Sequence, residues 1–206
     1  MDVQEISGAD VQQLFPLCRV NDILAGFYVP TDGRVNPVDA SMSLARGARN
    51  NGVKIFEGVT VDGVTEVICN GRRRVTGVST TTGHHIESEY VINCAGMWAR
   101  QLGEASGIVI PNQAAEHYYL VTERMSEVDP NWPVVEDPSS HTYIRPEGGG
   151  LMVGLFEPVA AAWNVKRIPQ DFSFGEITPD WERMAPFVET AMNRVPATLG
   201  AGEWSL

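Results

Sequence analysis

The segment from Tyr90 to Gly107, YVINCAGMWARQLGEASG, constrains the possible fold more than any other stretch of this 206-residue chain. Its apolar residues Tyr90–Ile92 predict a buried strand, which ends in small residues and runs directly into a helix. The turn Asn93–Gly96 places backbone amides at a helix start with no large side chain in the way, a geometry that suits a nucleotide. The alternative interpretation is a tight connection that needs glycine only for its backbone dihedral angles.

The residues before this segment predict alternating strands and helices. Gly26–Val29 predicts a strand, and Asn36-Pro37 predicts the cap and first position of a helix that Asn51-Gly52 ends. The apolar positions of that helix predict one buried face, and the following VKIF predicts a short strand. The order strand, helix, strand is typical of α/β proteins.

The remaining patterns predict antiparallel sheets. Residues 57–89 alternate around two glycine turns, which predicts a three-stranded meander. Past Pro111, HYYLVTE, HTYIRP and GLMVGLFEP predict a second sheet with a hairpin turn at Gly148–Gly150. A last helix is predicted with Thr178 as its cap and Pro179 at its first position. The fold class is therefore α/β, of the mixed α+β kind.

Charge and cysteine content exclude several classes of protein. The 26 acidic and 15 basic residues give a net charge of −11, which disfavours sequence-independent binding to nucleic acid or anionic membranes. The one basic run, Arg72–Arg74, follows Asn70-Gly71 and is interpreted as a solvated hairpin turn. Three cysteines without a CxxC pair predict reduced intracellular thiols, and four histidines without ligand spacing predict no metal site. The acidic start of the chain predicts no signal peptide.

Three residues of the second sheet are candidates for chemistry. His117 heads an aromatic strand, where it either packs as a structural residue or faces a ligand. Tyr143 and Arg145 are two positions apart, so they share a strand face and place a phenol beside a guanidinium that could hold a carboxylate. The alternative is cross-strand packing with a surface ion pair. No GxGxxG, GxxxxGK[ST], GxSxG or HExxH motif occurs in the chain.

The stretches DGRVNPVDASMSLARGARNNGVKIFEGVTVDGV, VINCAGMWARQLG, AAEHYYLVTE and NRVP, in this order, resemble the dimethylglycine and sarcosine dehydrogenase family of flavoproteins. The resemblance covers almost the whole chain and implies the D-amino-acid oxidase fold. It implies part of a Rossmann-like FAD-binding domain with an antiparallel meander, and part of an antiparallel substrate-binding sheet. It also implies a FAD-dependent dehydrogenase or oxidase that removes a hydride from an N-methyl carbon of dimethylglycine or sarcosine. Full-length relatives often pass the one-carbon unit to tetrahydrofolate in a further C-terminal domain.

The resemblance also assigns residues to the cofactor by their positions in the matching stretches. Val61 resembles the residue whose backbone meets the adenine of FAD. Cys94, Ala95 and Gly96 resemble the small-residue turn that passes the cofactor, and Trp98 resembles a residue that packs near the flavin.

On the substrate side, His117 and Tyr143 resemble the histidine and tyrosine beside the isoalloxazine ring, where such a pair can set the protonation state of the amine. Arg145 as the holder of the substrate carboxylate is an inference from its position beside Tyr143. Residues 29–110 are predicted to form part of the FAD-binding domain. Residues 1–28 and 111–206 are predicted to form part of the substrate-binding domain.

The family's N-terminal dinucleotide fingerprint, its flavin-linking histidine and its C-terminal closing segment have no counterpart in the sequence, so the chain resembles an internal part of a larger protein. The chain alone is expected neither to hold FAD tightly nor to turn over. The parent is expected in the cytoplasm or the mitochondrial matrix, acting on a small N-methyl amino acid, with an undefined electron acceptor. The rival interpretation is a non-catalytic relative such as the regulatory subunit of pyruvate dehydrogenase phosphatase, whose strand CEHFYLLTR is close to AEHYYLVTE.

Overall fold

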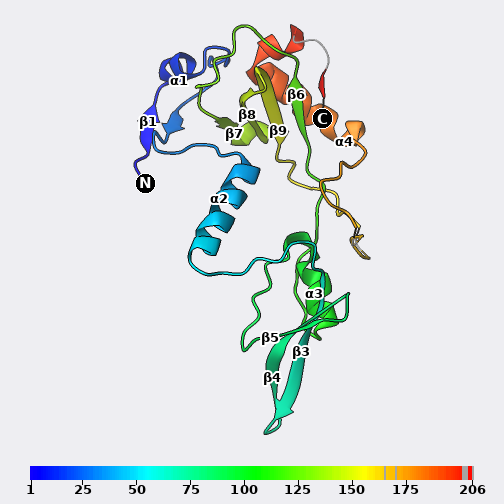
Figure 1. Ribbon diagram of the computed structural model, residues 1–206. Helices are drawn as coiled ribbons and strands as arrows, with labels where there is room; N and C mark the ends of the chain where they lie inside the picture. The colour runs from blue at the N-terminus through cyan, green and yellow to red at the C-terminus, as the bar shows by residue number, and fades with distance from the viewer. Residues whose placement is uncertain (165, 170, 201–203, 206) are drawn as a thin grey trace. The chain divides into compact units, whose positions relative to one another are not determined.

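The computed structural model describes residues 1–164, 166–169 and 171–200, together with the backbone of 204–205 (Figure 1). The chain divides into two compact units. Unit 1 comprises Met1–Asn36, His117–Ala160 and Glu176–Leu206, and unit 2 comprises Pro37–Glu116 and Ala161–Gly175. Within the described residues, no helix is both long enough and apolar enough to cross a bilayer.

Unit 1 is built on an antiparallel sheet with the strand order β10-β6-β9-β8-β7. The strands are β6 (Tyr119–Thr122), β7 (Val135–Asp137), β8 (Thr142–Glu147), β9 (Gly150–Leu155) and β10 (Trp204–Ser205). The β8–β9 hairpin turns at Gly148 and Gly149, whose φ angles of 59° and 89° favour glycine. The predicted second sheet and its glycine turn are therefore confirmed.

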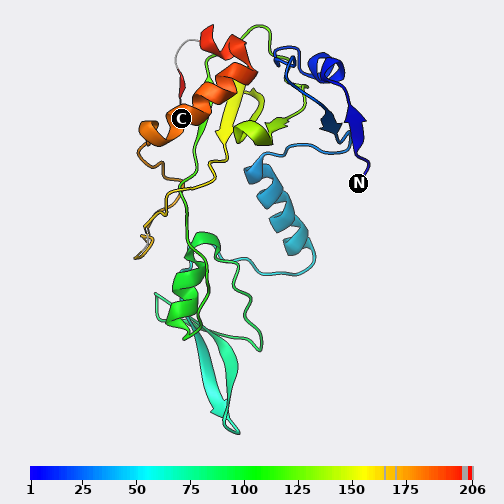
Figure 2. The ribbon, with the colours of Figure 1, turned by 180° about the vertical axis from the view of Figure 1, so that it is seen from behind.

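The two faces of this sheet differ in what covers them. Helix α4 (Trp181–Arg194) packs along one face, as Figure 2 shows from behind. The core between helix and sheet consists of buried apolar side chains, among them Leu120, Ile144, Leu151, Val153, Leu155, Met184, Val188 and Ala191. Along β8 burial alternates, so Tyr143, Arg145 and Glu147 lie partly exposed on the opposite face. We call that opposite face the open face.

Helix α4 begins differently from the prediction. The predicted cap Thr178 is wrong: the N-cap is Asp180, whose side chain accepts a hydrogen bond from the backbone amide of Arg183 at 3.0 Å. An N-cap carboxylate both satisfies an orphan amide and interacts favourably with the helix dipole. The carbonyl of Thr178 instead accepts a hydrogen bond from the Tyr118 hydroxyl at 3.3 Å.

The N-terminal part of unit 1 is a small satellite of strands and a helix. Strand β1 (Gln4–Ile6) pairs antiparallel with β2 (Gly26–Tyr28), and α1 (Gly8–Leu14) lies between them in the chain. A capping box between Ser7 and Asp10 fixes the start of α1. Two 3-10 turns, η2 (Pro138–Ser140) and η3 (Pro196–Gly200), complete the unit.

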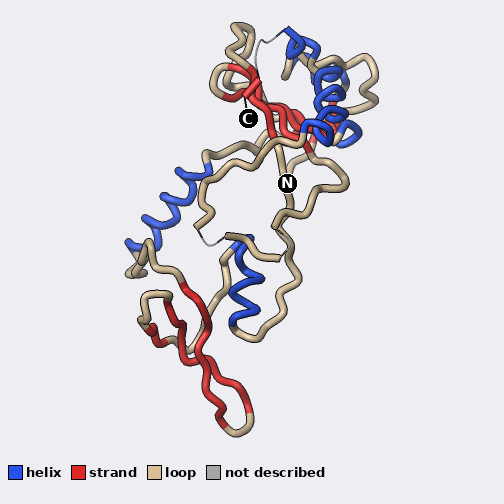
Figure 3. Tube along the Cα trace, turned by 90° about the vertical axis from the view of Figure 1, so that its right-hand side faces the viewer, coloured by secondary structure: helices blue, strands red, loops and turns tan. Residues whose placement is uncertain are grey.

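Unit 2 contains the predicted meander, with β3 (Val61–Cys69), β4 (Arg72–Thr80) and β5 (His85–Glu87) in sequential order (Figure 3). The β3–β4 turn is Asn70-Gly71, with φ angles of 50° and 72°, the backbone shape that asparagine and glycine favour in a two-residue hairpin. The meander is therefore confirmed. The basic run does not form the turn; it begins β4, where Arg73 pairs with Glu66 at 2.6 Å.

Two predicted strands of unit 2 are wrong. Neither Tyr90–Ile92 nor the VKIF stretch, Val53–Phe56, forms a strand, and both expose apolar side chains: Ile92 is 84% and Phe56 68% accessible. A buried parallel strand requires hydrogen-bonded neighbours and cover on both faces of the sheet. Among the described strands none pairs with either segment. The helical part after the turn forms as expected, as η1 (Gly96–Trp98) and α3 (Ala99–Ala105).

Helix α2 (Pro37–Asn50) has the predicted ends but not the predicted buried face. It begins at Pro37, and after its last residue Asn50 the chain turns at Gly52, which has a φ of 84°; the Val53 amide then donates to the Ala48 carbonyl at 3.1 Å. No residue of α2 is buried, and Leu44 is 76% exposed. The apolar stripe exists in the sequence, but nothing within the described residues of unit 2 covers it.

Candidate functional site

Three aromatic rings gather on the open face of the unit 1 sheet. The ring of Phe156, just after β9, stacks on the His117 imidazole with centroids 5.5 Å apart and an interplanar angle of 28°. The Tyr143 ring on β8 packs against the same phenylalanine, with centroids 5.1 Å apart. Because β9 lies between β6 and β8, residues far apart in the sequence meet here. The structure thus brings His117 and Tyr143 together around Phe156.

Gly154 determines where the Tyr143 ring can lie. The two residues are cross-strand partners on β9 and β8. A Cβ atom built at Gly154 would lie 1.9 Å from both Cε1 and Cζ of Tyr143, so the ring occupies the space that any side chain would need. The glycine therefore allows the phenol to lie across β9 toward Phe156.

The environment of Tyr143 favours its neutral form. Burial raises the pKa of the Tyr143 phenol above its ordinary value, and the positive charge of Arg145 offsets this effect only in part. The hydroxyl therefore remains protonated at neutral pH and can donate a hydrogen bond. This property suits a residue that orients a polar ligand without changing its own charge.

Arg145 lies on the open face beside Tyr143, but its guanidinium is already engaged. It forms an ion pair with the carboxylate of Glu147, two residues further along β8 on the same face. A substrate carboxylate would have to share the guanidinium with Glu147 or displace it. The role of Arg145 as a carboxylate holder stays a prediction.

The turn at Asn93–Gly96 in unit 2 is shaped by the side chain of Asn93. Its Oδ1 accepts a hydrogen bond from the Ala95 amide at 3.1 Å, and its Nδ2 donates to the Ala99 carbonyl at 3.0 Å. Gly96 has a φ of 53°, and a Cβ there would meet nothing within 4 Å. The backbone of this turn is therefore open on the side where a side chain would project.

Asn112 supports the same turn and leaves one polar atom without a partner. Its Nδ2 donates to the Gly96 carbonyl at 3.2 Å, whereas its buried Oδ1 has no hydrogen-bond partner among the described residues. Of the other predicted cofactor residues, Trp98 donates its indole N–H to the Pro169 carbonyl at 3.2 Å, and Val61 begins β3 opposite Thr80. Cys94 is exposed.

The predicted site residues therefore fall into two groups. His117, Tyr143 and Arg145 belong to unit 1, where they share the open face. The cofactor-side residues all belong to unit 2: Val61, Cys94, Ala95, Gly96 and Trp98. Their assigned roles toward FAD and substrate stay predictions.

Sequence reasoning missed three residues that shape the open face. Phe156 joins the two predicted catalytic rings, Gly154 makes room for one of them, and Glu147 pairs with Arg145. The sequence held an indication for all three. Glu147 is two positions after Arg145, and Phe156 is two positions after Gly154, so the members of each pair share one face of their strand. Identifying their partners required the strand register.

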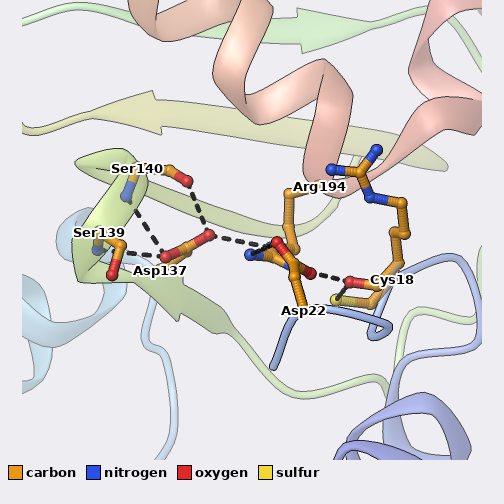
Figure 4. Close-up of polar contacts among 7 residues, drawn as sticks. Cys18, Asp22, Asp137, Ser139, Ser140 and Arg194 are labelled. Carbon is orange, nitrogen blue, oxygen red and sulfur yellow. Dashed lines mark hydrogen bonds and ion pairs between the residues drawn. The ribbon is translucent and has the colours of Figure 1, made fainter. Parts of the chain in front are cut away.

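A partly buried polar cluster elsewhere in unit 1 serves the fold. Arg194, at the end of α4, bonds to Asp137 at 2.9 Å and to Asp22 at 2.7 Å, and also donates to the Arg19 carbonyl (Figure 4). Burial disfavours the charged form of Asp137, but hydrogen bonds from Ser140 and Arg194 outweigh it and hold its pKa below the ordinary value. The cluster ties the N-terminal segment to the end of α4.

The cysteines form no disulfide within the described residues: Cys18 is buried, and the other two are exposed. The part of the chain that the structure describes also contains no group of three side chains suited to a metal ion.

The FAD that the resemblance implies fits these residues in part. Unit 1 offers the rings of His117, Phe156 and Tyr143, against which a flat aromatic ring can pack. Unit 2 offers the open backbone at Gly96 and the unpartnered Oδ1 of Asn112. The sequence contains no GxGxxG loop to hold a diphosphate. Each unit by itself therefore offers groups that a part of FAD could contact, and the sequence offers no GxGxxG diphosphate loop.

Comparison with known proteins shows the family to which the chain belongs. A family model described as FAD dependent oxidoreductase matches residues 1–205. Human mitochondrial sarcosine dehydrogenase is 37% identical over 192 residues, which cover 93% of this chain and 20% of that protein. Human mitochondrial dimethylglycine dehydrogenase is 31% identical over 194 residues, covering 90% of this chain and 22% of that protein.

Two further similarities concern a relative with a different described role and the fold. The mitochondrial regulatory subunit of pyruvate dehydrogenase phosphatase from Mus musculus is 35% identical over 199 residues, covering 93% of this chain and 22% of that protein. The crystal structure of L-proline dehydrogenase from P.horikoshii superimposes with a TM-score of 0.76 at 22% identity, covering 96% of this chain and 49% of that one. The chain thus spans about a fifth of the length of these curated relatives.

Proposed function

Because the chain belongs to the FAD dependent oxidoreductase family, we propose that its parent protein oxidatively demethylates an N-methylated glycine derivative, sarcosine or dimethylglycine. The substrate class comes from the two dehydrogenases that are 37% and 31% identical to the chain. The single observation in the structure that supports it most is the meeting of His117 and Tyr143 around Phe156 on the open face.

The chemistry divides between the cofactor and the chain. When bound, FAD would supply the hydride acceptor for oxidation of the N-methyl carbon, an oxidation that turns the substrate amine into an iminium ion. Hydride leaves more easily from an unprotonated amine, so an imidazole nitrogen of His117 takes the proton from the substrate ammonium. The neutral hydroxyl of Tyr143 donates a hydrogen bond that orients the amine. Arg145 shares its guanidinium between Glu147 and the substrate carboxylate.

The cofactor side of the proposal involves unit 2. Gly96 and its neighbours Cys94 and Ala95 would let the cofactor approach the backbone, with Val61 toward the adenine and Trp98 toward the flavin. Transfer of the one-carbon unit to tetrahydrofolate would require a part of the parent outside these residues. A cytoplasmic or mitochondrial matrix location is part of the same proposal, supported by the mitochondrial relatives.

We also propose that the partner is a small amino acid and neither nucleic acid nor a membrane surface, because a net charge of −11 repels polyanions. The rival function is a non-catalytic regulatory subunit, supported by the phosphatase subunit that is 35% identical to the chain. The residues of the open face do not separate these two functions, so the test has to measure the reaction itself.

The test is the visible absorption spectrum of the parent protein before and after anaerobic addition of sarcosine or dimethylglycine. We expect a bound flavin whose absorption bleaches, and bleaching that slows at least about tenfold in Tyr143→Phe. A flavin that neither compound bleaches would refute the proposed substrates. A protein without flavin would favour the regulatory function.

A further inference from the structure

Unit 1 contains a cavity that the proposed reaction does not use. It has a volume of about 440 Å³ and lies at the β8–β9 hairpin turn. Its lining includes Arg34 and Arg124, the hydroxyl-bearing Ser126, the carboxyl-bearing Glu147 and the turn glycines Gly148 and Gly149. Two guanidinium groups at one cavity stand out in a chain with a net charge of −11.

Arg34 is held in place by neutral groups. Its two terminal nitrogens donate hydrogen bonds to the carbonyls of Pro146 at 2.8 Å and Pro130 at 2.7 Å. These bonds fix the guanidinium but leave its charge without a carboxylate partner, and a guanidinium has five N–H donors of which these bonds use two. The remaining donors are positioned in advance for another acceptor.

Arg124 is positioned by packing against the hairpin turn. Its Nε lies 3.1 Å, and its Cγ 3.3 Å, from the position that a Cβ would occupy at Gly149. The glycine therefore lets the arginine side chain lie against the turn backbone. No ion pair of Arg124 occurs within the described part of the chain.

The acidic groups near the cavity do not neutralise these two charges. Glu147 lines the cavity, but its carboxylate is paired with Arg145. Asp129 uses Oδ1 to accept hydrogen bonds from the amide and side chain of Asn131. Within the described residues, neither arginine forms an ion pair with any acidic side chain of the neighbouring segments: Asp32, Glu123, Glu127 or Asp129.

We propose that this cavity binds the phosphate group of a small molecule. A phosphate carries close to two negative charges at neutral pH and has three acceptor oxygens, which match two exposed guanidiniums without a carboxylate partner, one of them held by two backbone carbonyls. A carboxylate carries one charge and satisfies one guanidinium fork. The site involves neither His117 nor Tyr143, and it shares with the proposed reaction only Glu147, the ion-pair partner of Arg145.

The test is a titration of the 206-residue chain with inorganic phosphate at constant ionic strength, followed by NMR of its backbone amides. We expect saturable shifts of the Gly148 and Gly149 amides. Arg124→Gln should weaken binding at least about tenfold, because charge-assisted hydrogen bonds are lost while no bond within the protein is broken. Arg34→Lys keeps the charge but loses the fork, and should weaken binding by a smaller factor.

The matched control is Arg72→Gln, which removes an exposed arginine of unit 2 outside the cavity and should leave phosphate binding unchanged. Circular dichroism of each variant establishes that it folds. Three outcomes would overturn the proposal: no saturable binding by the native chain, equal weakening in Arg72→Gln and Arg124→Gln, or acetate binding as tightly as phosphate.

Discussion

Replacing Gly154 by alanine tests the arrangement of the open face directly. The new Cβ would lie 1.9 Å from Cε1 and Cζ of Tyr143, whereas carbon atoms in contact are about 3.5 to 4.0 Å apart. The Tyr143 ring must therefore move by about 1.5 to 2 Å, which disturbs its packing on Phe156, now at a centroid distance of 5.1 Å. Overpacking of this kind costs about 1 to 3 kcal/mol. We expect the free energy of unfolding of the chain in urea to fall by that amount.

The loss of unfolding free energy in Gly154→Ala should depend on the Tyr143 ring, which the new methyl group displaces. In a Tyr143→Ala background the same substitution should cost less than about 1 kcal/mol, since the obstructing atoms are gone. Gly33→Ala is the matched control, because a Cβ at Gly33 meets nothing within 4 Å and should change stability by less than about 0.5 kcal/mol. The reasoning is refuted if Gly154→Ala is as stable as the native chain, or if its cost is the same without the tyrosine ring.

Three further predictions concern the rest of unit 1. Asp180→Ala removes the N-cap of α4 and should lower the unfolding free energy by about 1 kcal/mol in urea, whereas Asp180→Asn should retain most of it. Arg194→Met leaves the partly buried Asp137 carboxylate with only its hydrogen bonds from Ser139 and Ser140, and should lower the unfolding free energy by about 2 kcal/mol at pH 7. Because folding lowers the pKa of Asp137, the loss of unfolding free energy in Arg194→Met should be complete at pH values above the unfolded-state pKa of the carboxyl. It should shrink as the pH falls below about 4, and a loss that does not change with pH would contradict this reasoning. Burial raises the pKa of the Cys18 thiol, so a thiol reagent should modify only the two exposed cysteines of the folded chain, and rapid modification of all three would contradict the buried position.

The two hairpins and helix α4, which the sequence predicted correctly apart from the helix cap, are stabilised by elements that adjoin them in chain order. The β3–β4 hairpin depends on Asn70-Gly71 and on strands that follow each other directly, and the β8–β9 hairpin depends on its glycine turn in the same way. Helix α4 has its apolar stripe covered by those two neighbouring strands. In each hairpin the partner of a strand is the next strand, so local patterns contain enough information; α4 reaches the same hairpin only across residues 156–180.

The wrong predictions share the opposite property. Tyr90–Ile92 and Val53–Phe56 have the apolar residues of parallel strands, and α2 has an apolar stripe, but each needs partners that no described residue of unit 2 provides. The apolar periodicity of a segment indicates which of its faces needs to be covered by other residues. It does not indicate whether such residues lie nearby in the fold.

The same distinction explains what could be predicted of the site. Tyr143 and Arg145 are two positions apart, so their shared face follows from the strand period alone. The contact of His117 and Tyr143 with Phe156, and the space above Gly154, depend on β9 lying between β6 and β8, which no local pattern specifies. The resemblance to known flavoproteins identified the two rings; only the register shows that a glycine and a phenylalanine on the strand between them determine how they meet.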